Sequence, residues 1–140
     1  MAGTTLMIQP KTDYVMQASQ FAAGKSMQVV AARRIPVERW REGILLARVH
    51  AVSHWKAGAI ITLNWALDPF TQEDPALVWQ VPQQTPIIFK HGTDTPPVAK
   101  TQALAAPFGP LIMLEWVFTM AKVPVDMTIS VSIDLNLKGQ

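Results

Sequence analysis

The segment Gly24–Ser26 has the residues Gly-Lys-Ser with which a phosphate-binding loop ends. In such a loop, backbone amides and the lysine bind nucleotide phosphates, and a further glycine stands five positions earlier. This chain has Ser19 at that position, and the residues that follow, 27–30, have the composition of a strand instead of a helix. We therefore predict no nucleotide site and no cofactor.

Two histidines, His50 and His54, are four residues apart, a spacing that brings two metal ligands together on a helix. The surrounding residues instead have the pattern of a strand followed by a turn, and His91 is distant in the sequence. The acidic residues of segment 68–74 could bind calcium, but their spacing matches no calcium-binding loop. The sequence therefore predicts no metal site.

Glu115 and Asp134 are carboxylates that interrupt apolar segments, and paired carboxylates can perform acid–base catalysis when one pocket holds both. We interpret each of them instead as an exposed strand residue or as the partner in an ion pair between subunits. The sequence also lacks the Gly-x-Ser-x-Gly motif of serine hydrolases. We therefore predict no catalytic residues and no enzymatic activity.

The tryptophans provide the candidate contact residues. Trp65 and Trp116 fall on apolar positions of alternating segments, which predicts that they lie in the core. Trp55 lies in a short segment between two alternating stretches, Trp40 lies between two arginines, and Trp79 follows a proline-flanked segment. Exposed tryptophan stacks on sugar rings or anchors protein interfaces. We therefore predict Trp40, Trp55 and Trp79 as interface or glycan contacts.

The elements that must position these residues are strands. Apolar and polar residues alternate strictly over 127–138, which predicts a strand with one buried and one solvent-exposed face. Segment 111–120 is apolar on both faces, which indicates a central strand or one covered on both sides. The other predicted strands are 27–34, 43–52, 58–67, 86–90 and 98–104.

Short strands separated by turns that contain many of the 11 prolines are typical of an all-β fold. We predict an antiparallel β-sandwich in the form of a jelly roll. Residues 1–26 fit this pattern less well, and residues 14–23 could form a short helix. We therefore predict an N-terminal arm over 1–26, either extended against a neighbouring subunit or partly helical, and a sandwich domain over 27–140.

The composition is that of one globular domain of 140 residues, with 49% hydrophobic and only 16% charged residues. A low charge fraction agrees either with a small sandwich whose inner faces are both filled or with surface that is buried in an assembly. The absence of cysteine excludes disulfides and thiolate metal sites.

The net charge is +2, and the arginines lie within 33–48, interleaved with glutamates. We interpret this segment as a solvated face of mixed charge and predict no nucleic-acid partner. No stretch approaches the ~18 apolar residues of a membrane span, and the first residues lack the features of a secretory signal. We expect no membrane partner, and a cytoplasmic location until the protein is assembled into a particle.

The segments 107–116 and 125–135 together resemble the closing strands of small jelly-roll accessory proteins of tailed phages and phage-derived particles. The resemblance covers roughly the last quarter of the chain. It implies a decoration or minor capsid protein that acts through oligomeric contacts with itself and with a larger protein shell. The alternative is a carbohydrate-binding β-sandwich that recognises a glycan through Trp40, Trp55 or Trp79.

Overall fold

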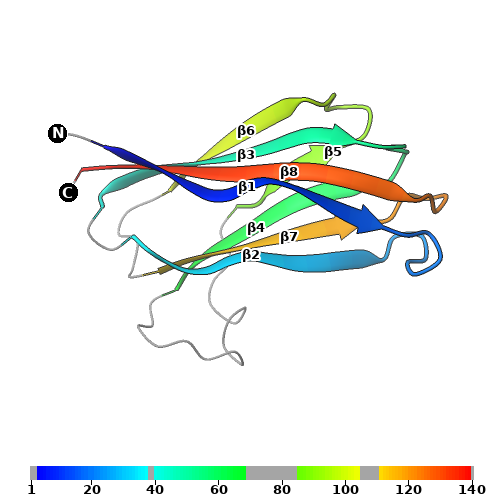
Figure 1. Ribbon diagram of the computed structural model, residues 1–140, viewed down its shortest axis with the longest axis horizontal. Coiled ribbons are helices and arrows are strands. Elements are labelled where there is room, and N and C mark those ends of the chain that lie inside the picture. Colours follow the sequence, from blue (N-terminus) through cyan, green and yellow to red (C-terminus); the bar gives the residue numbers. More distant parts are fainter. Residues whose placement is uncertain (1–2, 38–39, 69–84, 105–110, 140) are drawn as a thin grey trace.

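The computed structural model describes residues 3–37, 40–68, 85–104 and 111–139. These residues form an all-β antiparallel sandwich, as predicted, and among them there is no helix that could cross a membrane (Figure 1). The strands are β1 (Thr4–Met16), β2 (Ser26–Pro36), β3 (Glu42–Val52), β4 (Ile60–Asp68), β5 (Ile87–Lys90), β6 (Val98–Leu104), β7 (Leu111–Thr119) and β8 (Met127–Lys138).

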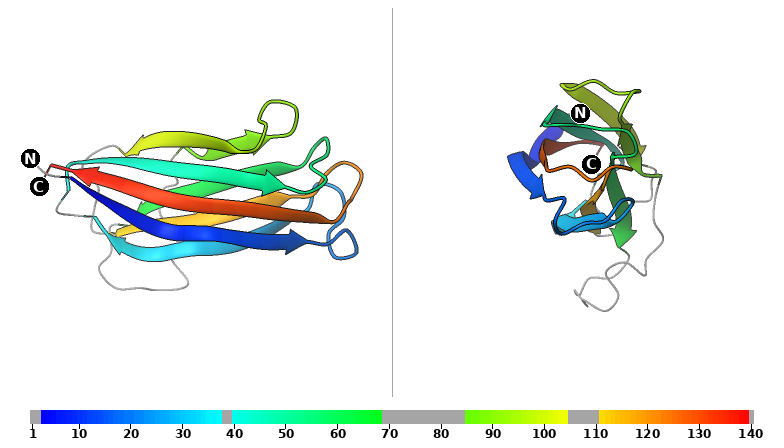
Figure 2. Two further views of the ribbon diagram at one scale, coloured as in Figure 1. Left: turned by 45° about the horizontal axis from the view of Figure 1, so that its top comes forward. Right: turned by 90° about the vertical axis from the view of Figure 1, so that its right-hand side faces the viewer.

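The strands form two sheets of four strands each. Sheet A has the order β1-β8-β3-β6, and sheet B has the order β2-β7-β4-β5. In the left view of Figure 2 the four strands of sheet A lie side by side in this order. The edges of the sandwich are therefore β1 and β6 in sheet A, and β2 and β5 in sheet B.

The chain pairs with itself from its two ends inward. β1 pairs with β8, β2 with β7, β3 with β6, and β4 with β5, always antiparallel. Additional pairs, β3 with β8 and β4 with β7, join these four ribbons into the two sheets. Because the first strand pairs with the last, Thr4 lies opposite Leu137, and Figure 1 shows the N and C ends next to each other.

The predicted strand over 127–138 is confirmed as β8, but Ser130 and Ser132 of its expected solvent-exposed face are buried. Its apolar residues at odd positions are all buried between the sheets, from Met127 to Leu137. β7 lies between β2 and β4 and buries Met113 on its outward face as well as Trp116 on its inward face, so the expected central strand is confirmed. The other predicted strands are all present, with ends that differ by at most two residues.

The short helix expected at residues 14–23 is wrong. Tyr14–Met16 form the end of β1, where Tyr14 lies opposite Ile129 and Met16 lies opposite Met127. Pairing with β8 thus decides the conformation of this segment, which overrides its local preference. Residues 4–16 are extended, as one form of the expected arm was, and they form an edge strand of sheet A in their own chain.

A buried polar contact connects the two sheets on the side of β1 and β2. The indole Nε1 of Trp116 in β7 donates a hydrogen bond of 2.7 Å to Oε1 of Gln9 in β1. The Nε2 of Gln9 in turn donates to the hydroxyl of Tyr14 at 2.6 Å. Gln9 is only 7% exposed and Trp116 is fully buried, so each group satisfies the other away from water.

A second contact connects the sheets on the opposite side, between β6 and β5. Lys100 of β6 points inward, and its Nζ donates to the carbonyl oxygen of Ile88 at 2.7 Å and to Oδ2 of Asp94 at 3.0 Å. The same ammonium group lies 5.2 Å from the centre of the Phe89 ring. The ammonium group of Lys100 therefore lies between the two edge strands and makes two hydrogen bonds to the protein, although its side chain is 35% exposed.

Candidate functional site

The outward face of sheet A carries a group of polar side chains from β3 and β8. Nη1 of Arg48 donates to Oδ2 of Asp134 at 3.2 Å, and a hydrogen bond of 2.8 Å joins Nε2 of His50 to the hydroxyl of Ser132. These contacts follow from the register, in which Arg48 lies opposite Ser132. The ion pair is solvent-exposed, at 46% for Arg48 and 21% for Asp134, so it contributes little stability of its own.

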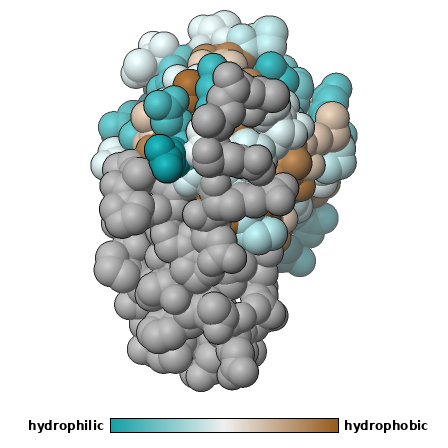
Figure 3. All heavy atoms as spheres, turned by 90° about the vertical axis from the view of Figure 1, so that its left-hand side faces the viewer, coloured by the Kyte–Doolittle hydropathy of each residue, from teal (hydrophilic) through white to brown (hydrophobic). Residues whose placement is uncertain are grey.

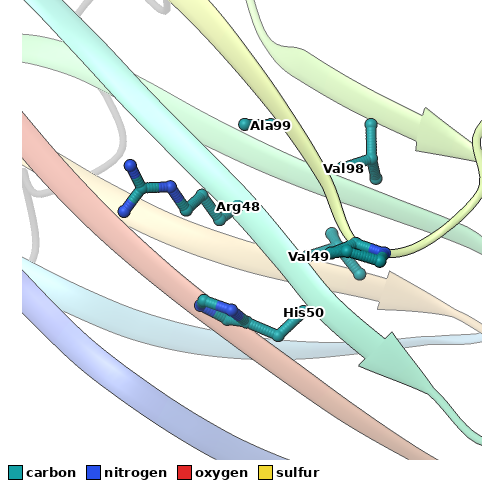
Figure 4. Close-up of a pocket in the computed structure, with 6 residues that line it drawn as sticks. Arg48, Val49, His50, Val98 and Ala99 are labelled. Atoms are coloured by element: carbon teal, nitrogen blue, oxygen red, sulfur yellow. The ribbon is translucent and has the colours of Figure 1, made fainter.

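A hollow of about 150 Å³ lies beside this group, between β3 and β6. Its lining residues are Arg48, Val49, His50, Pro97, Val98 and Ala99. Figure 4 shows Arg48 and His50 extending from β3 toward β8, while the short side chain of Ala99 projects from the next strand. The guanidinium of Arg48 and the imidazole of His50 thus line a hollow whose other lining side chains are small and apolar.

Ser130 is an unusual residue on the same face. It is 5% exposed, lies between Asp13 of β1 and Ala51 of β3, and its Oγ has no hydrogen-bond partner within the described residues. A buried hydroxyl without a partner loses its bonds to water and gains none in return. The hydroxyl of Ser130 therefore adds no hydrogen bond to the described part of this face.

Apolar side chains also project from the outward face of sheet A. Met7 of β1 is 71% exposed, Val15 of β1 57%, and Ile44 of β3 46%. Met7 and the half-buried Leu46 both lie opposite Asp134, one on each side of β8. Hydrophobic surface thus surrounds a carboxylate that is already paired with an arginine.

The predicted contact residue Trp55 lies in the connection between β3 and β4 and is half-buried against the core. Its Nε1 donates to the carbonyl oxygen of Ala59 at 3.0 Å, and its ring meets the His91 ring edge-on at 6.2 Å. The indole is thereby held in one orientation, with part of its surface accessible.

The structure does not bring the three predicted tryptophans together. Trp40 is half-buried against the core just before β3, whereas Trp55 follows β3. The two thus lie at opposite ends of a strand of 11 residues, which is about 35 Å long. Trp79 lies outside the described residues. Figure 3 views the end where the termini lie and shows hydrophobic and hydrophilic residues interspersed over its described part.

The three histidines lie apart from one another, and Gly24–Ser26 has no phosphate-loop geometry because a strand follows it. His50 bonds to Ser132, His54 lies in the β3–β4 turn, and His91 lies beside Trp55. The part of the chain that the structure describes contains no group of three or more residues placed to hold a metal ion. Gly24–Ser26 leads directly into β2, as the strand-like residues after it predicted.

The two carboxylates considered for catalysis lie in different sheets. Asp134 pairs with Arg48 of its own chain on sheet A. Glu115 projects from β7 on the outward face of sheet B, opposite Asn64 and Val30, and is 7% exposed, so the interpretation of an exposed position is wrong. Burial raises the pKa of Glu115, because the charged form loses its hydration.

Asp94 was not anticipated from the sequence. Burial by itself raises the pKa of its carboxyl group, but the backbone amide of Lys90 and the ammonium of Lys100 donate to the ionised form. The two donors together lower the pKa by more than burial raises it, so the pKa of Asp94 lies below its usual range. Asp94 therefore remains ionised at neutral pH and fixes the inward cation of β6.

No known protein-family model matches this sequence, and a search of curated proteins gives no significant match. The geometry of the outward face of sheet A and of the Trp55 corner is therefore the basis for a functional proposal.

Proposed function

We propose that the protein is a structural component of a virion or similar particle, and that its sandwich is a jelly roll. The order of the strands supports the fold assignment: four antiparallel ribbons, formed by pairing the chain from its ends inward, are distributed over two four-stranded sheets. Eight strands in two sheets with this winding are typical of jelly rolls, which occur in viral capsid proteins and in lectins. Because a fold does not determine a function, the choice between a capsid role and a lectin role rests on the properties of the surface.

The observation that carries the structural role is the outward face of sheet A. Met7, Val15 and Ile44 expose between 46% and 71% of their surface on one side of one sheet. Met7 lies level with Leu46, and Ile44 lies two residues along β3 from Leu46, and exposed hydrophobic side chains that lie near one another mark sites of protein–protein contact. The protein therefore acts by oligomeric contacts, with itself and with a larger shell, and not by catalysis. It is cytoplasmic until it is assembled into the particle.

Mass spectrometry of particles purified from the natural host tests this role. Peptides of this chain are expected in the particle fraction, in a fixed ratio to the major shell protein that persists through successive density gradients. A chain that is found only in the particle-free fraction would contradict the proposal.

A carbohydrate-binding role is the second candidate, and the Trp55 corner favours it. Trp55 is half-exposed, held by its bond to Ala59 and flanked by the His91 ring, which is a rigid aromatic platform of the kind that stacks on sugars. If this role is correct, Trp55→Ala abolishes binding on a glycan array, whereas the variant of its exposed neighbour, Lys56→Ala, retains it. An array on which the unmodified protein binds no glycan would reject this alternative.

A further inference from the structure

We propose that two copies of this chain associate through the outward face of sheet A, about a twofold axis parallel to the strands. The inference rests on the proposed structural role and identifies the surface that carries it.

Each edge of the sandwich has a feature that opposes the addition of a strand from another chain. β1 contains Pro10 and two shifts of register, β2 contains two shifts of register, and β5 has only four residues. β6 directs Lys100 inward. Bulges, prolines, short edge strands and inward charges are the means by which proteins prevent edge-to-edge pairing. Association therefore uses a face and not an edge.

The hydrophobic side chains identify which face this is. The large apolar residues that are exposed in the described part of the chain are Leu6, Met7, Val15, Ile44 and Val123. Three of them project outward from sheet A, and none of them belongs to a strand of sheet B. Among the described residues, the outward face of sheet A thus exposes more large hydrophobic side chains than that of sheet B.

The distribution of charge on this face suits a second copy of itself. A twofold axis parallel to the strands places β8 of one copy over β3 of the other, since these are the two central strands. Asp134 lies on β8 and Arg48 on β3, so each copy offers a carboxylate where its partner offers a guanidinium. A surface with charges of one sign would instead repel its copy.

The sizes of the side chains match in the same arrangement. The axis places β1 of one copy over β6 of the other, because these are the two edges of sheet A. β1 projects Met7 and Val15, whereas the outward residues of β6 are the smaller Ala99, Thr101 and Ala103, which lie opposite outward residues of β3. Met7 of one copy thus meets Thr101 of the other, because Met7 and Leu46 both lie opposite Asp134 and Leu46 lies opposite Thr101, whereas Val15 lies beyond the end of β6.

The area of the face approaches that of a standard dimer interface. Its four strands have 7 to 13 residues. At about 3.3 Å per residue and about 4.8 Å between strands, they present roughly 700 Å². Standard protein interfaces bury about 800 Å² on each partner, so sheet A alone nearly reaches this size.

Sedimentation of the full-length protein over a range of concentrations tests the surface. The unmodified protein is expected to form a dimer, and Ile44→Glu to weaken it at least about tenfold, because two carboxylates then enter the interface. Val123→Glu is the matched control, since it adds the same charge at a residue that is 76% exposed and lies outside sheet A. Circular dichroism establishes that both variants are folded. A dimer that Ile44→Glu leaves intact overturns the proposal.

Cross-linking tests the axis, because the chain has no cysteine of its own. Met7 and Thr101 lie on opposite edges of sheet A, about 14 Å apart within one copy, which is too far for a disulfide. A mixture of Met7→Cys and Thr101→Cys proteins is expected to form a disulfide-linked pair, whereas Met7→Cys mixed with Val123→Cys is not. Equal cross-linking in both mixtures overturns the axis.

A protein that is monomeric at every concentration overturns the dimer, even when it is found on purified particles. That combination leaves the structural role intact and assigns the face to a shell protein. Absence from particles, in contrast, rejects the structural role whether or not the dimer forms.

Discussion

Replacing Gln9 tests the buried polar contact between the sheets. Gln9→Met keeps most of the side-chain volume but leaves Nε1 of Trp116 without its acceptor, which now lies at 2.7 Å. A buried donor that loses its partner costs about 1–3 kcal/mol. Tyr14 as a whole is only half-buried, so we expect its hydroxyl to bond to water in the variant and the loss of its bond to Gln9 to add little. We expect Gln9→Met to lower the free energy of unfolding by about 1–3 kcal/mol.

A double-mutant cycle separates the free energy of the hydrogen bond between Gln9 and Trp116 from that of side-chain packing. Trp116→Phe removes the donor, so adding Gln9→Met to that variant leaves no group unsatisfied and costs less than it does in the unmodified protein. Urea unfolding followed by circular dichroism measures all four proteins, and Gln28→Ala, at an exposed position of β2, is the control that stays within about 0.5 kcal/mol. If Gln9→Met costs the same with and without Trp116, the hydrogen bond does not stabilise the fold and the reasoning is refuted.

Three further changes follow from the same physical chemistry. Asp94→Asn is expected to lower stability by about 1–3 kcal/mol at neutral pH, because the bond to the Lys100 ammonium loses its ionised acceptor. The pKa of Asp94 is lowered in the folded state, so its ionised carboxylate stabilises the fold at neutral pH. This stabilisation is lost as the pH falls through the folded pKa. Urea unfolding at acidic pH should therefore show no difference between the variant and the unmodified protein. Glu115→Gln should raise stability near neutral pH, because a raised folded pKa means that the fold disfavours the charge. The gain should vanish in acid, where Glu115 is protonated in both states, and a pH series of melting temperatures measures it. Ser130→Ala should leave the melting temperature unchanged or raise it, since its Oγ has no partner among the described residues. Ser132→Ala should instead lower stability by about 0.5–1.5 kcal/mol, because its bond to the imidazole of His50 is lost. The opposite order of the two variants would contradict the assignment of partners.

The alternation of apolar and polar residues predicted the strands in which it is strict, and it did not predict the strand in which it is interrupted. β8 alternates from its first residue to its last, so it could be located with correct ends. β1 could not, because its register shifts twice between Met7 and Thr12, which moves successive residues to the same face. The order of the strands in each sheet also could not be predicted, since alternation shows which face is buried and not which strand lies alongside.

The candidate site was predictable only in part. Trp55 was correctly placed between two strands, but its bond to Ala59 and its contact with His91 depend on segments that are remote in sequence or adopt a specific turn. Lys100 could have been noticed, because it occupies an apolar position in the alternation of β6 between Val98 and Leu104. A charge at such a position indicates a partner across the sandwich, here the carbonyl of Ile88.

The pairing of first strand with last determines when the protein can fold during its synthesis. β7 and β8 are made last among the strands, yet each lies inside its sheet, β8 between β1 and β3 and β7 between β2 and β4. While the ribosome is still translating residues 111–138, β1 and β2 have no neighbour, and only local ribbons such as β4 with β5 or β3 with β6 can form. The nascent chain therefore holds unpaired, hydrophobic strands until translation of β8 is finished. Folding then depends on contacts between the most distant parts of the chain, which makes it slow and dependent on protection from aggregation.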